Sequence, residues 1–439
     1  MKHKKLFIAF TAVFTVLLAL VIFIMIWIWG DSYKSNDRFD GFEDYRKEIQ
    51  IPGLKDGACP QGIGNYRAKY TVKDENGNPV TDANGKETTA TQDYFFISAY
   101  FDKQPSRIYV IGNTTGLVGY VTLKNTDGSY NNEHCGGVAT NGYTLWVASG
   151  KKVLVASKKN STSTDNIAYD IIKAAEENGE LQFTSEFHAN LNAAFCFFYD
   201  ADGDPANRSY NDRFYVGEFY RSGNYETDKK HHLTTPNGNE NKAFMYEYNI
   251  STSENDYGLT TLTADNLSGK NVVPRIQAIY SITDQIQGVA RTKDTSDSSN
   301  GNTWKGGVVL SQSYGLANSH ILYYDWAKIT KTDSGNRTSY KDLTYKNEKG
   351  DDVKYARFEY EGITTNSGAP YYYTNSDLYV YYVDDSKILN NYSIPSMSEG
   401  MCVINDRVYV LFESGANKYK TFVREVLNHV YSFIPRNKK

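Results

Sequence analysis

The stretch that decides the fold reads His134-Cys135-Gly136-Gly137-Val138-Ala139, followed after a short turn by Thr144-Leu145-Trp146-Val147-Ala148-Ser149. A polar residue and two glycines open an apolar run, and a second apolar run ends in a small polar residue. Short runs rich in β-branched and aromatic side chains, bounded by Gly and Asn, predict two strands joined by a tight turn.

The same unit recurs four more times along the chain. The other copies are Gln61-Gly62-Ile63-Gly64 leading to Phe95-Phe96-Ile97-Ser98, Asn192-Ala193-Ala194-Phe195 leading to Phe214-Tyr215-Val216-Gly217-Glu218, Gln287-Gly288-Val289-Ala290 leading to Val308-Val309-Leu310-Ser311, and Glu399-Gly400-Met401-Cys402 leading to Val408-Tyr409-Val410-Leu411-Phe412-Glu413. Repeated strand pairs of this kind predict blades of a β-propeller. We expect an all-β propeller of five or six blades, the sixth lying within residues 330–395, with one decorating helix over residues 166–178.

Composition agrees with an all-β domain. The chain has 37 Tyr and 21 Phe against 5 Met, and aromatic side chains suit the half-buried surface of a sheet. With 47 basic and 51 acidic residues the formal net charge is only −4. No block of like charge follows the first five residues, so we expect no nucleic-acid partner.

An apolar segment without charge runs from Leu6 to Trp29, long enough to cross the roughly 30 Å hydrocarbon layer as a helix. Lys2, Lys4 and Lys5 precede it and acidic residues follow, so the positive-inside rule places the N-terminus in the cytoplasm. A cleaved signal peptide, the alternative, has a shorter apolar core and a small-residue cleavage site. We therefore expect a single-pass signal anchor in the cell membrane: residues 1–5 cytoplasmic, 6–29 transmembrane, 30–50 a stalk and 51–439 an extracellular propeller.

Four cysteines lie near the starts of repeats: Cys59, Cys135, Cys196 and Cys402. Their positions favour small buried side chains on tightly packed inner strands. Disulfides stay open as an alternative because the exterior permits them. The chain has no C-x-x-C spacing, which argues against a Cys/His metal site.

The residues that open the repeats should converge on one mouth of a central channel. These are Gln61, His134, Asn192, Gln287 and Glu399. A second ring is expected where the next strands end, at Ser98, Ser149, Glu218, Ser311, Ser313 and Glu413. Glycine follows the opening residues because inner strands crowd the axis of a propeller and only a missing side chain permits close approach.

Three interpretations of this ring stand side by side. The polar groups could simply satisfy one another or bind water. They could bind a ligand through Gln61, His134, Asn192, Gln287, Ser311, Glu399 and Glu413, or a divalent cation such as calcium with Glu399 and Glu218 as candidate ligands. They could also catalyse a reaction, with His134 as general base beside Glu399 or Glu218. The chain has no G-x-S-x-G, H-E-x-x-H, P-loop or dinucleotide motif to support catalysis.

A run of alternating carboxylates, Asp200-Ala201-Asp202-Gly203-Asp204, is similar to the start of an EF-hand loop. Pro205 stands where that loop requires glycine, and Asn211 stands where it requires a bidentate glutamate. These differences favour a solvated turn over a calcium site.

Several short motifs together resemble a group of secreted or membrane-anchored bacterial β-propeller proteins, broadly in the superfamily of gluconolactonases, strictosidine synthase and streptogramin lyase. They are Cys59-Pro60-Gln61-Gly62, His134-Cys135-Gly136-Gly137, Val216-Gly217-Glu218-Phe219-Tyr220-Arg221, Leu310-Ser311-Gln312-Ser313-Tyr314-Gly315, Met397-Ser398-Glu399-Gly400 and Leu411-Phe412-Glu413-Ser414-Gly415. The resemblance implies a ring fold outside the cell. Lactonases and lyases of that superfamily place metal ligands at the inner ends of their strands, whereas the five openings here hold one His and one Glu.

The leading functional hypothesis is a membrane-anchored extracellular propeller that binds a small molecule, glycan or protein at its channel mouth or top loops. A lactonase-like hydrolase or lyase using His134 with Glu399 or Glu218 is one alternative. A structural or adhesive cell-surface protein, using Tyr-rich runs such as Tyr371-Tyr372-Tyr373, is another, since tyrosine provides contact area at low entropic cost.

Overall fold

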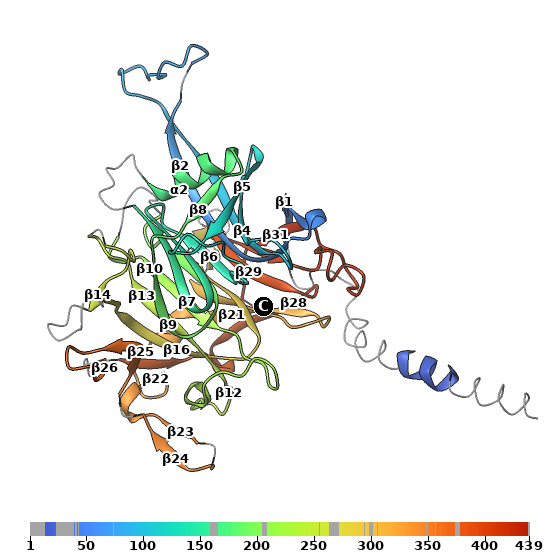
Figure 1. The fold of residues 1–439 in the computed structure, drawn as a ribbon, viewed down its shortest axis with the longest axis vertical. Coiled ribbons are helices and arrows are strands. Elements are labelled where there is room, and N and C mark those ends of the chain that lie inside the picture. Colours follow the sequence, from blue (N-terminus) through green and yellow to red (C-terminus); the bar gives the residue numbers. More distant parts are fainter. Residues whose placement is uncertain are drawn as a thin grey trace, which may run out of the picture.

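The structure is a computed structural model that describes residues 14–22, 39, 42, 44–72, 74–158, 166–203, 209–253, 255–262, 272–293, 295–297, 302–304, 306–347, 349–355, 357–373 and 378–437. Most of the described residues form strands (Figure 1). The helices of the folded body are α2 (Ile167–Glu176) and α3 (Trp326–Ile329), with single 3₁₀ turns at Leu54–Asp56, Lys229–His231, Tyr340–Asp342 and Asp385–Lys387.

The predicted strand pairs are present in all five repeats. Each opening strand pairs antiparallel with the next strand in its repeat. The pairs are β2 (Cys59–Thr71) with β3 (Thr89–Tyr100), β6 (Gly137–Thr140) with β7 (Thr144–Ser157), β9 (Ser185–Tyr199) with β10 (Arg213–Glu218), β17 (Ile286–Arg291) with β20 (Gly307–Gln312), and β29 (Ser398–Ile404) with β30 (Arg407–Phe412).

Further antiparallel strands extend each pair outward. β4 (Arg107–Gly112) and β5 (Gly116–Lys124) continue the first unit, and β13 (Ala243–Asn249) and β16 (Ile276–Ile282) continue the third. β21 (Ser319–Asp325) and β28 (Ile388–Ile394) continue the fourth. The first half of β9 pairs with β7, and its second half pairs with β10. This one strand therefore serves two neighbouring units.

The five inner strands close on one another as a ring, in the order β2, β6, β9, β17, β29 and back to β2. Glycines permit this approach. A Cβ on Gly62 would lie 2.6 Å from the Cα of Gly137, and one on Gly400 would lie 2.9 Å from the Cα of Gly62. Real Cβ atoms do not come this close to a neighbouring backbone, so the glycines predicted to crowd the axis are required there. The fold is a β-propeller.

The last unit combines both ends of the folded chain. β31 (His429–Phe433) pairs with β30, and β1 (Arg46–Gln50) pairs with β31 on the outside. An ion pair supports the closure, with Arg407 Nη2 3.0 Å from Asp44 Oδ2. The propeller thus begins at Arg46 rather than at residue 51, because part of the segment expected to be a stalk supplies its closing strand. Strand β1 is thereby the outer edge of this four-stranded sheet.

Within residues 330–395, where a sixth unit was expected, the described strands that join a larger sheet do so in the third and fourth units. β27 (Tyr379–Tyr382) pairs parallel with β16 and antiparallel with β22 (Arg337–Ser339), which widens the third unit. The apolar runs of residues 377–383 and 387–394 are close in sequence and predict a hairpin, but this prediction is wrong, since β28 pairs with β21 instead. Alternating apolar residues identify a strand but not its partner.

Short hairpins decorate the rim. They are β11 (Leu233–Thr234) with β12 (Glu240–Asn241), β14 (Thr261–Leu262) with β15 (Val273–Pro274), β18 (Thr295–Asp297) with β19 (Asn302–Trp304), β23 (Thr344–Lys346) with β24 (Asp352–Lys354), and β25 (Glu359–Thr364) with β26 (Pro370–Tyr372). The expected helix is confirmed as α2, capped by the Asn166 side chain. It lies beside β5, to which β8 (Glu180–Gln182) adds a parallel strand (Figure 1).

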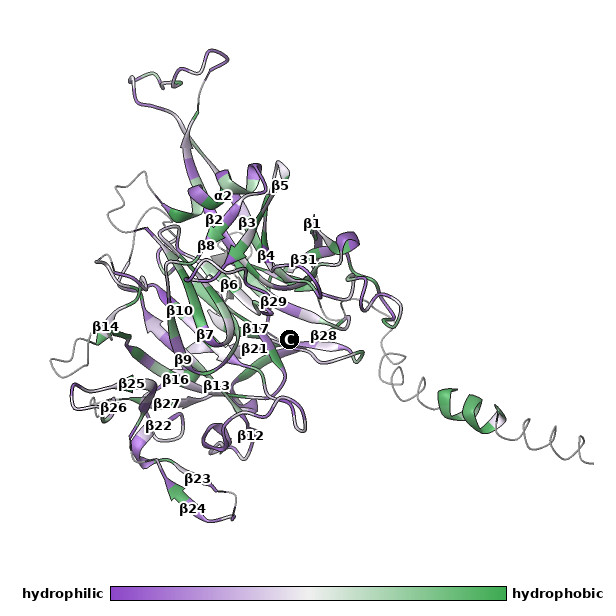
Figure 2. Cartoon of the chain, viewed as in Figure 1, coloured by the Kyte–Doolittle hydropathy of each residue, from purple (hydrophilic) through white to green (hydrophobic). Residues whose placement is uncertain are grey.

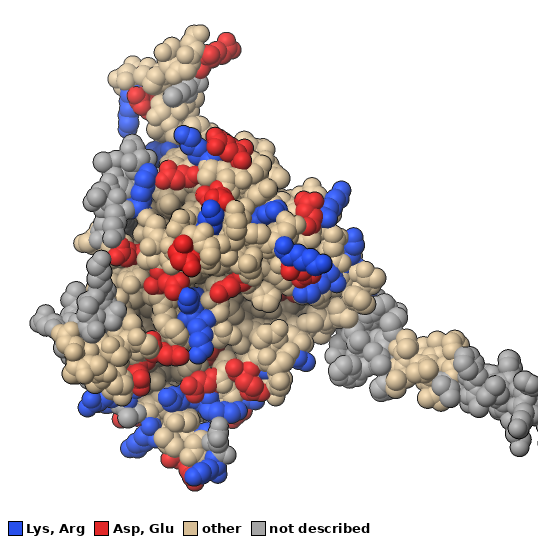
Figure 3. Space-filling model, viewed as in Figure 1, with Lys and Arg blue, Asp and Glu red and all other residues tan. Residues whose placement is uncertain are grey.

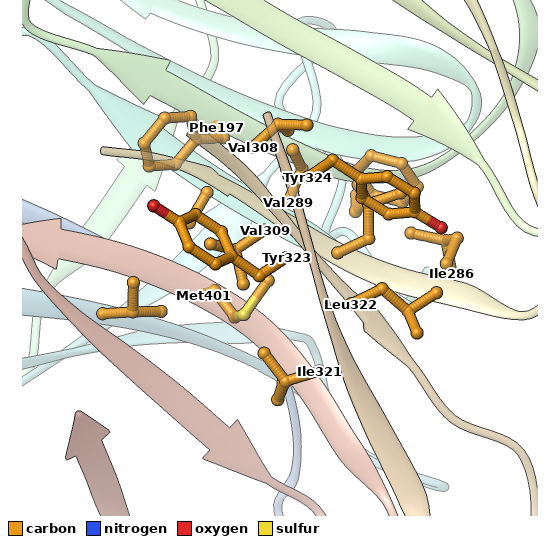
Figure 4. Close-up of a cluster of buried hydrophobic side chains, with 14 of the residues drawn as sticks. Phe197, Ile286, Val289, Val308, Val309, Ile321, Leu322, Tyr323, Tyr324 and Met401 are labelled. Atoms are coloured by element: carbon orange, nitrogen blue, oxygen red, sulfur yellow. The ribbon is translucent and has the colours of Figure 1, made fainter. Parts of the chain in front are cut away.

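The apolar core fills the spaces between neighbouring units. In Figure 4 side chains from β9, β17, β20, β21 and β29 meet in one cluster, among them Phe197, Val289, Val309, Ile321 and Met401. Figure 2 shows the corresponding strands as largely hydrophobic. Both faces of these sheets are covered, which explains why the inner strands read as continuous apolar runs.

All four cysteines are free and buried, which agrees with small side chains on packed inner strands. Burial raises the pKa of the Cys135 and Cys196 thiols to about 12. These two thiols stay protonated at neutral pH and are unreactive.

Residues 14–22 are helical, with exposed apolar side chains that include Phe14, Leu17 and Ile22 (Figure 2). The rest of the expected membrane segment, residues 6–13 and 23–29, lies outside the described residues. Among the residues that the structure describes, no helix is both long and apolar enough to cross a membrane.

Candidate functional site

The five opening residues meet at one mouth of the channel. Gln61, His134, Asn192, Gln287 and Glu399 all line a single cavity of about 340 Å³, although they come from five different repeats. Glu413, from the end of β30, lines it as well. The fold thus brings together residues up to 338 positions apart in the sequence, Gln61 and Glu399, in the lining of one cavity.

Backbone conformation helps to place three of these residues. Asn190, Gln285 and Met397 have left-handed φ angles of 56°, 58° and 64°, and each stands two positions before a residue that lines the cavity. Non-glycine residues rarely adopt this conformation, which costs of order 1 kcal/mol or more. The surrounding fold holds it in place, because the Met397 carbonyl accepts a hydrogen bond from the Glu413 N–H at 3.0 Å and the Gln285 carbonyl accepts one from the Ser313 N–H at 2.9 Å.

Glu399 and Glu413 form a buried carboxyl pair at the floor of the cavity. Burial raises the pKa of Glu399 well above its ordinary value of 4.5, and the Glu413 carboxyl, to which it is hydrogen-bonded, raises it further. Burial also raises the pKa of Glu413, but hydrogen bonds from Cys59, Glu399 and Gln61 oppose that rise. Glu399 is therefore the member that keeps the proton at neutral pH, since two adjacent buried carboxylates cannot both ionise cheaply.

One oxygen of this pair has no partner. Glu399 is only 2% exposed, and its Oε1 makes no hydrogen bond to any residue that the structure describes. Glu413, in contrast, is bonded on Oε2 by Gln61 Nε2 at 3.1 Å and by Cys59 Sγ at 3.5 Å. A buried oxygen left without a donor is costly, and here it belongs to a residue that lines a cavity.

His134 stands at the exposed edge of the same cavity. Its ring lies edge-on to the Tyr100 ring, with centroids 4.1 Å apart. Partial burial, together with the nearby Lys418 ammonium, lowers the pKa of His134 below its ordinary value of 6.5. The imidazole is therefore neutral at pH 7, with one ring nitrogen able to accept a hydrogen bond.

Aromatic side chains that the sequence did not single out surround the polar floor. Tyr100, Phe219, Tyr225, Tyr314 and Tyr419 all line the cavity. Phe219 and Tyr314 directly follow the expected second strands of their repeats, so a signal for them was present in their position after a strand end. Tyr100 also closes β3, whereas nothing in the local sequence points to Tyr225 or Tyr419.

The second predicted ring is mostly structural. Ser98 Oγ donates to the Cys135 carbonyl at 2.8 Å and accepts from the Gly62 N–H at 3.0 Å. Ser311 Oγ contacts Ser398 Oγ at 2.7 Å, and this buried pair lies outside the cavity lining. These hydroxyls tie inner strands to their neighbours. Of the second ring, Glu413 alone is part of the wall that the described residues form.

Glu218 has a different place from the one expected for a catalytic or metal-binding residue. It is 1% exposed, does not line the cavity, and accepts hydrogen bonds from the Phe244 N–H at 2.9 Å and from His231 Nδ1 at 2.5 Å. The ring of His231 stacks on Phe244. The Glu218 carboxylate thus accepts hydrogen bonds within the third unit and stabilises that unit. The candidate residues that remain at the channel mouth are His134, Glu399 and Glu413.

The opposite end of the inner strands forms a second cavity of about 230 Å³. Asp200, Asp202 and Asp212 place carboxylate oxygens within 4.8 Å of one another at its edge. Asp212 accepts backbone N–H bonds from Ala201 at 2.9 Å and Ser209 at 3.0 Å, as a turn of this kind requires. Burial raises the pKa of Asp212 to about 6. Asp212 was not recognised from the sequence as a neighbour of the other two.

Several solved structures match this chain, and one of them is a WD40 domain. A solved structure of the Neurospora crassa Pan2 WD40 domain matches with a TM-score of 0.23 and 9% identity, over 84% of this chain and 71% of that chain. No protein-family model matches the chain, and no curated protein matches it. The β-propeller assignment therefore stands on the closed ring of inner strands.

Proposed function

We propose that this chain is a five-bladed, membrane-anchored extracellular propeller that binds a small hydroxyl-rich ligand, such as a saccharide, in the cavity at its channel mouth. The observation that carries the proposal is that polar side chains from five repeats, among them Asn192, Gln287 and Glu399, converge on this one cavity. Ligand hydroxyls are suited to such a wall, because they both donate and accept hydrogen bonds. The anchor in this proposal is the segment from Leu6 to Trp29, and the resemblance to secreted bacterial propellers of the gluconolactonase-like superfamily supports the external location.

The rest of the wall suits the same ligand. The side-chain amides of Asn192 and Gln287 make no hydrogen bond to any described residue. Each side chain therefore offers a ligand both a donor and an acceptor. Tyr and Phe rings surround these groups, and aromatic faces pack well against the apolar face of a sugar ring. An apolar wall with a few converging polar groups is the usual composition of a small-molecule site.

Isothermal titration of the full-length protein in detergent with a panel of neutral oligosaccharides tests the proposal. A hydrogen bond to a neutral group contributes about 1 kcal/mol, so Gln287→Ala should weaken binding by roughly fivefold. Gln182→Ala, on exposed strand β8 outside the cavity, is the matched control and should bind like the wild type. Absence of saccharide binding, or an equal loss in both variants, would reject the proposal.

The carboxyl pair favours hydrolysis as a second candidate function. The Glu413 carboxylate could take a proton from a water that attacks an ester or lactone carbonyl, while Glu399 gives its proton to the leaving oxygen. The proton then returns from Glu413 to Glu399 through their shared hydrogen bond. Glu399→Gln should abolish turnover of such a substrate while binding persists; unchanged turnover would exclude this role.

A further inference from the structure

Two cations on the rim of the cavity lack a carboxylate partner in the part of the chain that the structure describes. Lys418 Nζ lies 3.1 Å from the Tyr100 hydroxyl and over the rings of Tyr100 and Tyr419, each 5.3 Å from the centroid. The guanidinium of Arg221 lies 3.8 Å above the Tyr314 ring and donates only to the Asn224 side chain. Both cations therefore rest on tyrosines that line the cavity.

Two other lysines next to the cavity are paired. In the adjoining hollow, which shares Tyr100, His134 and Gly150 with the cavity, Lys151 binds Glu361 at 3.2 Å and Lys152 binds Glu186 at 2.7 Å. Glu133 of this hollow lies near enough to Lys152 to raise its pKa. On the face shown in Figure 3, acidic and basic side chains are likewise intermixed over the described residues. Lys418, which lines the same adjoining hollow, and Arg221 differ from these two lysines because neither forms an ion pair with a carboxylate of the described residues.

The floor of the cavity does not supply the missing negative charge in full. Glu399 is held in its neutral form by burial and by Glu413, so the carboxyl pair carries about one charge rather than two. That charge is bonded by Gln61 and Cys59, and it lies near enough to Lys418 for the ammonium to lower the pKa of Glu413. It can offset one of the two cations but not both. A cation held over an aromatic ring keeps its outer side available to a ligand, and attraction to an anion there is strong because the rings limit solvation.

We propose that the ligand is an acidic oligosaccharide, with its hydroxyls on the amide and carboxyl floor and its carboxylates on Lys418 and Arg221. This inference rests on the proposed saccharide site and adds the charge of the ligand. The aromatic rim contacts the sugar rings, and the two cations at the rim provide the counter-charges. Neutral saccharides fill the same floor but leave both cations without partners.

The test compares oligogalacturonate, oligoglucuronate and alginate oligomers with their methyl esters, which keep the hydroxyls but lose the charge. Titration of the full-length protein at low salt should show the acids binding about tenfold more tightly than the esters, and the difference should shrink as salt rises. Lys418→Gln should remove most of the difference without changing affinity for the ester. Lys420→Gln, an exposed neighbour outside both hollows, is the matched control. Arg221→Gln probes the second cation in the same way.

The outcomes separate the two proposals. Equal affinity for acid and ester would overturn the acidic-ligand inference while leaving the saccharide site in place. Loss of ester binding in Lys418→Gln would mean that the lysine acts through packing, and this result would also overturn the acidic-ligand inference. If sugar phosphates or inorganic phosphate bind as tightly as the uronates, the anionic group of the ligand is a phosphate and not a carboxylate. This result would overturn the inference of a uronate ligand. If no saccharide of either kind binds, both proposals fail.

Discussion

The side-chain amide of Gln61 donates a hydrogen bond to Glu413 Oε2 at 3.1 Å, so the opening of the first repeat is bonded to the end of a strand in the last one. The same carboxylate lies beside Glu399 and Cys59. The junction that closes the ring is therefore also the floor of the candidate site. Changes to this floor should affect stability and binding together, whereas changes at the aromatic rim should affect binding alone.

Stability should decline as pH rises, because of the carboxyl pair. The folded pKa of Glu399 is raised above 4.5, so the folded protein binds more protons than the unfolded chain between pH 4.5 and the raised value. By linkage, the free energy of unfolding falls through this window by about 1.4 kcal/mol for each unit of pKa shift. Urea denaturation should show Glu399→Gln to be more stable than the wild type at pH 8 and similar at pH 4. Exposed Glu75→Gln should leave the pH profile unchanged, and an unchanged profile in Glu399→Gln would show that the pair does not titrate in this way.

A side chain at the ring axis should be strongly destabilising. Gly62→Ala places a Cβ 2.6 Å from the Cα of Gly137, and backbone must move to relieve the clash. We expect a loss of about 3 kcal/mol or more in the free energy of unfolding. Gly335→Ala is the control, because its Cβ would meet nothing closer than the Asp333 carboxylate at 3.6 Å. Equal stability of the two variants would contradict the tight ring.

Glu218 should matter for folding rather than for the site. Glu218→Ala leaves the Phe244 N–H and the His231 ring without their acceptor, and breaking a buried pair of this kind costs about 3 kcal/mol. Thermal unfolding should record the loss, while ligand affinity measured below the melting temperature stays at the wild-type value. A variant that kept its melting temperature but lost binding would return Glu218 to the list of site residues.

Removing the closing strand should weaken the last unit. A chain that starts at residue 51 lacks β1 and the Asp44 partner of Arg407, whereas one that starts at residue 39 keeps both. The shorter chain should melt several degrees lower and exchange the amide hydrogens of β31 faster, since these hydrogen bonds lose their partners. Identical exchange of β31 in the two chains would show that β1 does not close the sheet.

Much of the architecture could be predicted because the repeat is local. Gln287-Gly288-Val289-Ala290 specifies an inner strand by its own composition, and α2 carries both its apolar spacing and its Asn166 cap within one stretch of sequence. The partners of β27 and β28 could not be predicted, because they lie roughly 40 to 100 residues away and an alternating pattern does not specify which strand is the partner. The position of the two chain ends indicates closure by an early strand near Ile51 or by the terminal segment Val430 to Ile434, and the structure uses both regions, as β1 and β31.

The site was predicted in part. A polar residue before an inner-strand glycine is a local pattern, so Gln61 and Gln287 could be placed at the mouth. The proton shared by Glu399 and Glu413, in contrast, depends on burial and on a contact between two strands, which no spacing in the sequence expresses. Lys418 was not recognised because a single exposed lysine is ordinary until its tyrosine neighbours are known.

The pairing of β1 with β31 also has a consequence for biosynthesis. A ribosome makes residues 46–50 long before residues 429–433. Strand β1 therefore has no partner strand until nearly the whole chain has been translated. Until then its hydrogen-bonding groups remain open to other chains, the situation in which nascent β proteins associate wrongly. A chain terminated before residue 429 would keep both that strand and β30 exposed, so quality control in the cell should remove such fragments quickly.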